Sequence, residues 1–420
     1  MARYFIKTFG CKVNQVESED LHEALERRGA QRVANLLEAD FAIVNTCTVT
    51  GEADRKVRKE LRKSARFPNA IAVIVTGCSA ALLKDELEVL DEKIQVVPDK
   101  KDIATYLSKY SEVVPLVADL ENSKVLPAAQ KRIRIPIKVQ DGCEDFCSYC
   151  IVPFARGKCS SVGADEVVSK IKKLADAGTK EVILTGINLG NYSDATLNSR
   201  AASLTALLRR IQNETSIHRV RLSSIEPRHI SDELLDFYKE NNLLCEHFHI
   251  PLQSGSDYVL GDMNRSYSAD EYRQTIKKIR EIKPNTAITT DIIVGYPSES
   301  SDDFQQTFEL VKEISFSKIH IFRYSSRVGT AAERLKPLHP RTIRQRAQAM
   351  QEQAAADETH YYESRVGSEV ELVIEELAKD ETATGTTREY LRLTLPLSDL
   401  ASSPNNAQSP QLGDIVTAQL

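Results

Sequence analysis

The chain has 420 residues and is 41% hydrophobic and 27% charged, a composition typical of a globular protein with two to three domains. Its first residues lack the basic and apolar regions of a secretory signal, and no apolar run is long enough to span a bilayer. We therefore expect a cytoplasmic protein, which excludes a disulfide-rich secreted fold and a membrane protein. The net charge of −5 does not by itself indicate a nucleic-acid binder.

Residues 1–115 predict an α/β domain, because apolar strands alternate with helical segments. Such an alternation is typical of a parallel sheet covered on both faces. Gly29 and Pro68 are the expected stop signals of the two helices. The expected strands are residues 3–9, 40–45 and 70–76, and the expected helices are residues 17–28 and 50–66.

A cysteine follows each of these strands, namely Cys11, Cys47 and Cys78. The carboxyl ends of parallel strands line one edge of a sheet, where such folds bind ligands, so the three thiols can converge. Three thiols hold three irons of a 4Fe–4S cluster and leave the fourth iron open. The alternative is three unrelated small core residues, since free cysteine is often buried.

The second helix carries a run of positive charge, with seven Lys or Arg side chains between residues 55 and 66 against the single acid Glu60. Such a helix can contact RNA, because phosphate contacts need Lys and Arg. It can equally be a solvated helix face, and the sequence favours neither interpretation.

Residues 111–130 lack periodicity and contain Pro115 and Pro127, which predicts a linker to a second domain over residues 131–364. That domain opens with residues 131–140, where basic and apolar residues alternate as in a half-buried strand. The strand leads directly into a group of three cysteines.

Cys143, Cys147 and Cys150 are separated by three and then two residues. Thiolates are soft ligands that select iron–sulfur clusters or zinc. Three thiols again leave one iron of a 4Fe–4S cluster open for a small molecule, and this spacing is the signature of radical S-adenosylmethionine enzymes. A structural zinc site closed by Cys159 is the alternative.

Beyond these cysteines, strands and helices alternate, and with residues 131–140 the strand-like runs number six. This predicts a partial barrel of parallel strands, short of the eight in a closed barrel. The other expected strands are residues 181–186, 218–225, 246–251, 286–295 and 318–324. The expected helices are residues 164–177, 203–214, 231–241, 268–283 and 301–314.

Chemistry in barrels takes place at the carboxyl ends of the strands, so polar residues there are candidates to contact a cofactor or substrate. Each of them can instead be a structural cap. The candidates are Asn188, Glu226, Gln253, Asp291, Tyr324 and Ser325.

A helix over residues 340–364 begins with proline, which suits a first helical turn. Residues 365–420 return to strand-like alternation, with a loop over residues 402–410, and predict a small all-β module. This module holds four Lys or Arg against nine Asp or Glu, whereas the rest of the chain has 51 of each sign.

The chain resembles the methylthiotransferases of the radical S-adenosylmethionine superfamily over essentially its whole length. Residues 1–115 carry the motifs Gly10-Cys11-Lys12-Val13-Asn14-Gln15, Asn45-Thr46-Cys47-Thr48-Val49-Thr50 and Thr76-Gly77-Cys78. Residues 131–364 carry the Cys143-x3-Cys147-x2-Cys150 spacing and the segments 222–227, 251–256, 263–265, 291–297 and 324–330. Residues 365–420 resemble the TRAM module that such enzymes use on RNA, although their acidity is contrary to the basic surface that RNA binding favours. Cys159 departs from the family pattern as an extra thiol.

The resemblance implies a 4Fe–4S cluster on Cys143, Cys147 and Cys150 that cleaves S-adenosyl-L-methionine to a 5′-deoxyadenosyl radical. It implies a second 4Fe–4S cluster on Cys11, Cys47 and Cys78 that holds a sulfur species, which a second S-adenosyl-L-methionine methylates. The methylthio group then replaces hydrogen at carbon 2 of a modified adenine in the anticodon loop of tRNA. An electron donor such as flavodoxin or ferredoxin is implied, and we expect a monomer without membrane contact.

The sequence around Cys11 is similar to the branch that acts on N6-threonylcarbamoyladenosine at position 37, next to the anticodon. The isopentenyladenosine branch typically has Gly-Cys-Gln-Met-Asn there, and the branch that acts on a ribosomal protein aspartate has Gly-Cys-Pro-Lys-Asn. Both of these substrates stay open as alternatives. A zinc-stabilised RNA-binding protein without catalysis is the alternative outside the enzymes.

Overall fold

The computed structural model describes residues 2–110, 132–194, 203–402 and 410–420. The expected linker over 111–130 and most of the expected loop over 402–410 lie outside these ranges. The chain forms two compact units. The first comprises the described part of Met1–Gln130 together with Gly142–Lys158 and Ser325–Glu333, and the second comprises the remainder. The three-domain boundaries expected from the sequence stay predictions.

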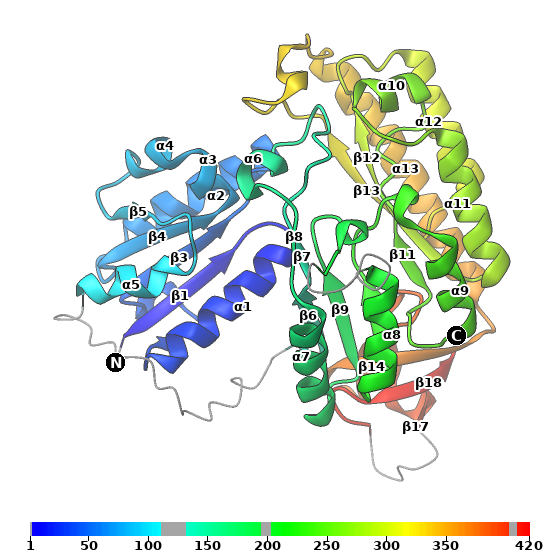
Figure 1. Ribbon diagram of the computed structural model, residues 1–420, viewed down its shortest axis with the longest axis horizontal. Coiled ribbons are helices and arrows are strands. Elements are labelled where there is room, and N and C mark those ends of the chain that lie inside the picture. The colour runs from blue at the N-terminus through cyan, green and yellow to red at the C-terminus, as the bar shows by residue number, and fades with distance from the viewer. Residues whose placement is uncertain (1, 111–131, 195–202, 403–409) are drawn as a thin grey trace. The chain divides into compact units, whose positions relative to one another are not determined.

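The first unit is built on a five-stranded parallel sheet with the strand order β2-β1-β3-β4-β5 (Figure 1). This confirms the α/β interpretation and adds two short strands that were not expected. The strands are β1 (Arg3–Thr8), β2 (Gln31–Arg32), β3 (Phe41–Thr46), β4 (Ala72–Gly77) and β5 (Ile94–Val96). The helices are α1 (Lys12–Arg27), α2 (Gly51–Ala65), α3 (Cys78–Leu82), α4 (Lys84–Glu88) and α5 (Asp102–Leu107).

Every residue of β3 and β4 is buried, because helices cover both faces of the sheet. Phe41 and Ile43 pack with α1 and α5 on one face. Ala42 and Val44, which alternate with them, pack with α2, α3 and α4 on the other face. These two layers hold the carboxyl ends of the strands in fixed positions.

The expected start of the first helix was wrong, since α1 begins at Lys12 rather than at residue 17. The missed turn buries Val13 and Val16 together with the polar Asn14, whose side chain donates to Asn45 and Thr46. Two apolar residues beside a buried polar one are too few to show a helical period. Cys11 thus becomes the residue that precedes the helix.

The second unit contains the expected partial barrel. Two three-stranded parallel sheets, β10-β9-β6 and β11-β12-β13, are joined by bridges between Val220 and Leu244 and between Ser224 and His249. The strands are β6 (Arg134–Lys138), β9 (Glu181–Thr185), β10 (Arg219–Leu222), β11 (His247–His249), β12 (Ala287–Val294) and β13 (Lys318–Arg323). The helices are α7 (Ala164–Asp176), α8 (Leu204–Glu214), α9 (Asp232–Glu240), α10 (Asp257–Asp262), α11 (Ala269–Ile282), α12 (Ser301–Ile314) and α13 (Pro340–Arg365).

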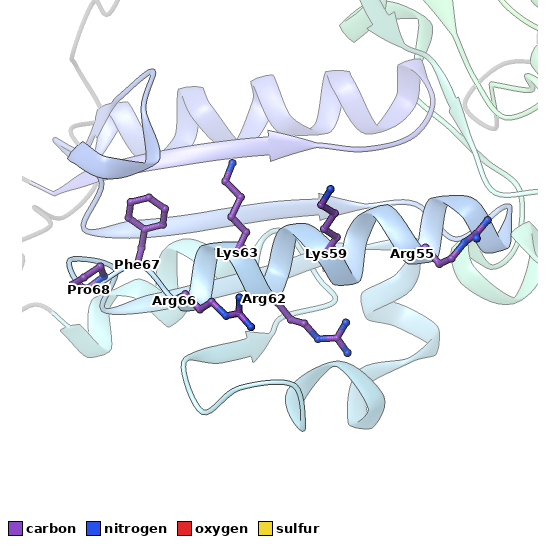
Figure 2. A pocket seen from close by; sticks show the side chains of 7 residues that line it. All are labelled: Arg55, Lys59, Arg62, Lys63, Arg66, Phe67 and Pro68. Atoms are coloured by element: carbon purple, nitrogen blue, oxygen red, sulfur yellow. The ribbon is translucent and has the colours of Figure 1, made fainter.

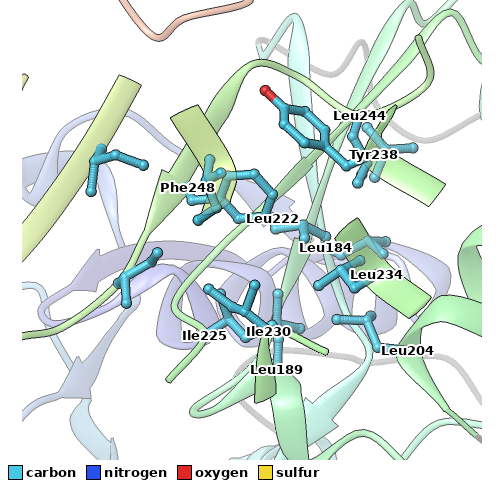
Figure 3. Packing of buried hydrophobic residues seen from close by; sticks show 14 of the residues in the cluster. Leu184, Leu189, Leu204, Leu222, Ile225, Ile230, Leu234, Tyr238, Leu244 and Phe248 are labelled. Carbon is cyan, nitrogen blue, oxygen red and sulfur yellow. The ribbon is translucent and has the colours of Figure 1, made fainter. Parts of the chain in front are cut away.

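One large apolar core lies between these strands and helices. Figure 3 shows part of it, where Leu184 and Leu222 of neighbouring strands pack against Leu204 and Leu234 of α8 and α9. A short antiparallel pair, β7 (Gln140–Asp141) with β8 (Ser160–Ser161), flanks the segment that carries the three spaced cysteines. Within the described ranges, no helix combines the length and the apolar character needed to cross a membrane.

Residues 369–419 form the expected all-β module, a five-stranded antiparallel sheet. Its strands are β14 (Glu369–Leu377), β15 (Thr382–Thr387), β16 (Arg392–Pro396), β17 (Leu400–Ser402) and β18 (Ile415–Gln419). The fully buried Arg219 and Arg221 of β10 donate to Glu181 and to backbone carbonyls of Thr386 and Thr387. These guanidinium groups hold the pKa of the buried Glu181 carboxyl at about 2 against the opposing effect of burial.

Candidate metal centre

Cys11, Cys47 and Cys78 lie at the carboxyl edge of the five-stranded sheet, as the strand pattern predicts. Cys11 precedes α1, Cys47 directly follows β3, and Cys78 begins α3 directly after β4. Cys11 is exposed, whereas Cys47 and Cys78 are buried, and all three thiols are free. The fold therefore gathers one accessible and two shielded thiols at a single edge.

The chain segments that carry these thiols touch one another. Gly10 has φ +109°, and a Cβ atom added there would lie 2.8 Å from Cβ of Cys47. Gly77 has φ +89°, and a Cβ atom added there would lie 2.5 Å from the carbonyl oxygen of Thr46. Any side chain at either position would push the segments apart, so glycine is required at both.

Asn14 forms hydrogen bonds that connect the loops at this edge. Its Nδ2 donates to the carbonyl oxygen of Thr46 at 2.8 Å, and its Oδ1 accepts a bond of 3.3 Å from the thiol of Cys11. On the other side of Cys47, the Ser79 hydroxyl donates to the Cys47 carbonyl oxygen at 3.0 Å. The loops that carry the thiols are thus held by buried hydrogen bonds, which lose much stability when one partner is removed.

Arg156, at the end of α6 (Val152–Arg156), reaches this same edge. Its guanidinium bonds to Glu17 at 3.0 Å, to Asn14 at 2.8 Å and to the Cys78 thiol. The Arg156 and Glu17 side chains are 7% and 8% exposed, and Lys100 gives Glu17 a second cation at 2.9 Å. A buried positive charge therefore lies against the Cys78 thiol.

The surroundings of these thiols act on their pKa values in opposite directions. Burial, reinforced by the neighbouring thiols, raises the pKa of Cys47 to about 11 and also raises the pKa of Cys78. Arg156 lowers both pKa values. Because thiolates are the metal-binding form of cysteine, a bound cation is needed to stabilise the deprotonated set.

The second set of thiols lies on the loop that contains Cys143, Cys147 and Cys150. Cys147 is buried, and the other two are partly exposed. The loop is closed by a bond of 3.2 Å from the Cys143 amide to the Gly157 carbonyl and one of 2.9 Å from the Cys150 amide to the Cys147 carbonyl. Burial raises the pKa of Cys143. Short backbone bonds thus hold this loop in a compact turn.

Two backbone conformations shape the loop. Gly142 has φ +72°, and an added Cβ atom would lie 2.0 Å from the carbonyl oxygen of Lys158. Phe146 has φ +47°, which is strained for a bulky residue, and its ring packs edge-on against Phe154 at 6.2 Å. Both rings are more than half exposed. Strain of this kind is typical of functional loops.

Both thiol sets belong to the first compact unit, because this unit includes Gly142–Lys158. Within the described residues, no group of three or more His, Cys, Asp or Glu side chains is arranged so that it could hold a metal ion without rearrangement. Sequence reasoning missed Arg156, although it is the first basic residue after Cys150. Cys159 belongs to the second unit and is partly exposed.

Ser325 also belongs to the first unit. Its hydroxyl accepts a bond of 2.9 Å from the amide of Gly51, the first residue of α2. Nearby, Arg327 donates to the carbonyl of Thr48 and to Asp54 at 2.9 and 2.7 Å. Ser325 and Arg327 therefore support the segment that follows Cys47.

The other candidates lie in the second unit. Asn188 is a structural cap, since its side chain accepts from the Gly190 amide at 3.2 Å. Tyr324 packs edge-on against Tyr296 at 5.4 Å. Gln253 has φ +64°, and its backbone bonds to β12, where its amide donates to the Asp291 carbonyl at 2.8 Å.

Two acidic candidates have basic neighbours that the sequence did not reveal. Glu226 bridges Arg228 at 3.0 Å and Arg265 at 2.8 Å. Asp291 lies 3.4 Å from Nε2 of His249, and both side chains are partly exposed. Arg228 is two residues from Glu226, but Arg265 and His249 come from distant positions in the chain, so spacing alone gives no signal for them.

Two family models match the chain. Residues 137–311 match the radical SAM superfamily, and residues 3–98 match uncharacterized protein family UPF0004. Among solved structures, the radical S-adenosylmethionine methyltransferase TsrM from Kitasatospora setae aligns with a TM-score of 0.54 and 15% identity. That alignment covers 77% of this chain and 75% of TsrM, and it supports the fold alone.

Curated relatives match over most of both chains. The threonylcarbamoyladenosine tRNA methylthiotransferase MtaB of Thermotoga maritima is 39% identical over 88% of this chain and 86% of its own length. MtaB of Bacillus subtilis is 33% identical over 90% of this chain and 86% of its own length. The tRNA-2-methylthio-N(6)-dimethylallyladenosine synthase of Thermodesulfovibrio yellowstonii is 36% identical over 79% of this chain and 78% of its own length.

Proposed function

Because the chain belongs to the radical S-adenosylmethionine methylthiotransferases that modify tRNA, we propose that its substrate is N6-threonylcarbamoyladenosine at position 37. The reaction inserts a methylthio group at carbon 2 of that base. Support comes from the Gly10–Gln15 motif and from the MtaB relatives, whose names specify this nucleoside. As a member of this family the chain is an enzyme that uses S-adenosyl-L-methionine and a 4Fe–4S cluster, so the non-catalytic zinc protein is set aside.

The proposed cluster ligands are two sets of three cysteines. Cys143, Cys147 and Cys150 would hold the cluster that binds S-adenosyl-L-methionine, and Cys11, Cys47 and Cys78 would hold a second one. The donor chemistry fits, because each set offers three cysteines that form no disulfide, and three thiols leave one iron open. The observation that carries this proposal is the presence of both sets in one compact unit, with Arg156 bonded to the edge that carries Cys78.

The bound cofactors supply a one-electron cleavage and a radical able to activate an aromatic C–H bond, which side-chain acid–base chemistry does not achieve. Side chains and backbone of the chain hold the thiol-bearing loops in place and balance their charge. Arg156 offsets the negative charge of three thiolates beside the buried Glu17, and Asn14 fixes the loops that carry Cys11 and Cys47. Gly142 lets the backbone close tightly around the Cys143 loop.

Polar side chains of the second unit are the proposed contacts for S-adenosyl-L-methionine and the substrate base. Glu226 and Asp291 are each held by a cationic or imidazole neighbour, and Gln253 lies on the same strand edge as Asp291. Asn188 is engaged as a cap and would contribute through its backbone position. The flavodoxin or ferredoxin donor and the monomeric state stay predictions.

Nucleoside analysis of tRNA tests the proposed substrate. Cells that lack this protein should lack 2-methylthio-N6-threonylcarbamoyladenosine and accumulate the precursor without the methylthio group. The wild-type protein should restore the product, whereas Cys143→Ala should not. Loss of the methylthio form of isopentenyladenosine instead would assign the other tRNA branch, and two unchanged nucleosides would contradict the proposal.

A further inference from the structure

Five cations of α2 lie on one face of that helix. At 100° per residue, Arg55, Lys59, Arg62, Lys63 and Arg66 fall within an arc of about 100°. All five are exposed. The opposite face packs into the core of the first unit through buried Val57, Leu61, Ser64 and Ala65. We call the five residues the α2 cationic face.

The α2 cationic face borders a hollow. Together with Phe67 and Pro68, its five side chains line a surface depression of about 530 Å³. In Figure 2, Lys59 and Lys63 extend from one edge of the cationic face and Arg62 and Arg66 from its other edge. Phe67 lies beyond the last turn of the helix. The depression is therefore a charged groove with an apolar end.

The acidic residues near α2 pair mainly with cations outside this face. Glu52 binds Lys56 at 2.8 Å, and Glu86 binds Arg58 at 2.6 Å. Within the cationic face, Lys63 lies 3.8 Å from Glu60. In the described part of the chain, Arg55, Lys59, Arg62 and Arg66 have no carboxylate within 4.0 Å. The positive charge of the groove is thus largely uncompensated.

Repulsion between the like charges of the α2 cationic face destabilises the helix when no anion is bound. Arg55 with Lys59, Lys59 with Lys63, and Arg62 with Arg66 are like-charge pairs four residues apart, and each such pair is destabilising. A bound polyanion removes that repulsion and releases its own counterions. We propose that the α2 cationic face binds the phosphate backbone of the tRNA substrate.

RNA fits this surface better than a folded protein does. Arg55 and Arg66 are eleven residues apart, which spans about 16 Å along the helix and accommodates several phosphates. Five of the seven residues that line the groove are cations, whereas the cores of protein–protein interfaces are depleted of charged residues. The partly buried Phe67 ring at the end of the groove offers a base a stacking surface. α2 begins four residues after Cys47, so the groove lies on the element next to the proposed sulfur-bearing thiols.

The inference rests on the proposed function for the identity of the RNA. Contacts to phosphates are independent of base identity. The groove should therefore contribute equally to tRNA with and without the threonylcarbamoyl group.

The test measures tRNA binding by the iron-loaded full chain as a function of salt. The variant is Arg62→Gln with Arg66→Gln. The control is Lys56→Gln with Arg58→Gln, which removes the same charge from the two borders of that face, where each cation is already paired with a carboxylate. Losing two phosphate contacts should reduce the slope of log affinity against log salt by roughly 1.4 and weaken binding about twentyfold at 0.1 M salt. The control should shift both values much less. Iron content and reductive cleavage of S-adenosyl-L-methionine should match wild type in both proteins.

Catalysis gives a second readout. The variant should raise KM for tRNA and leave kcat at saturating tRNA unchanged, because the groove holds substrate without touching the reacting atoms. Equal salt slopes and affinities for the variant and the wild type would overturn the inference while leaving the proposed function intact. A wild-type enzyme that binds tRNA but makes no methylthio product would instead overturn the proposed function.

Discussion

Arg156 is the residue whose loss should most clearly disturb the thiol-bearing edge. Arg156→Gln leaves Glu17 paired with Lys100 and removes the positive charge next to Cys78. Breaking a buried ion pair of this kind costs about 3 kcal/mol. We expect a lower melting temperature for the first unit and less iron bound per chain, measured by thermal unfolding and iron analysis.

Lys100→Gln is the matched control for that variant. Lys100 binds the same Glu17 carboxylate but is 22% exposed, so water can replace it more easily. It should affect stability and iron content less than Arg156→Gln does. Equal effects of the two substitutions would show that the charge on Glu17, rather than the position of Arg156 against Cys78, matters.

Some residues of the candidate site could be predicted from the sequence, and others could not. The six cysteines could be proposed as ligands because thiol spacing and strand ends are visible in the sequence itself. Arg156 and Glu17 are 139 positions apart, and their contact exists only once the loop after Cys150 packs on α1. Glu226 with Arg265 and Asp291 with His249 were missed for the same reason.

At the scale of elements, the loop that carries Cys143, Cys147 and Cys150 depends on the backbone of Gly142. Gly142→Ala places a Cβ atom 2.0 Å from the Lys158 carbonyl oxygen, which is backbone and cannot move aside. The loop must open, so we expect about half the iron content and loss of reductive cleavage of S-adenosyl-L-methionine. Iron analysis and assay of 5′-deoxyadenosine measure both effects.

Gly157→Ala controls for the strain of the substitution. Gly157 has φ +73°, close to the +72° of Gly142, but an added Cβ atom there meets nothing within 4 Å. Both variants therefore place alanine at a positive φ, which costs on the order of 1–3 kcal/mol, and only one carries the clash. If Gly157→Ala lost as much iron as Gly142→Ala, backbone strain rather than the clash would explain the effect.

The boundaries of helices and strands were predicted most accurately where the hydrophobic pattern of the sequence is strong. β3 and β4 were predicted closely because they are continuous apolar runs buried on both faces. β2 and β5 have two and three residues, too few to show a period. The early part of α1 was missed because its single turn before Glu17 shows only two apolar positions, Val13 and Val16, beside the buried polar Asn14.

The C-terminal module shows how a charge count can mislead at this scale. Several of its acids bind arginines inside the second unit. Glu371 binds Arg219 and Arg388, and Glu375 binds Arg134. Glu371 and Glu375 therefore link the module to barrel arginines, and total charge alone does not describe the module's surface.

In the whole molecule, the two compact units hold different groups of proposed functional residues. The first unit holds both thiol sets and the α2 cationic face. The second holds the partial barrel and the acidic candidates Glu226 and Asp291. Chain order did not reveal this division, since Gly142–Lys158 and Ser325–Glu333 pack with the N-terminal region by tertiary contacts alone.

In the proposed mechanism, two clusters act in sequence. One generates the radical, and the other supplies the sulfur. The most direct test of this mechanism compares anaerobically reconstituted wild type with Cys11→Ala. Wild type should bind roughly eight irons and the variant roughly four. The variant should still cleave S-adenosyl-L-methionine reductively and yet form no methylthio product on tRNA. Product at the wild-type rate from Cys11→Ala, or stoichiometric zinc without iron in the wild type, would contradict this mechanism.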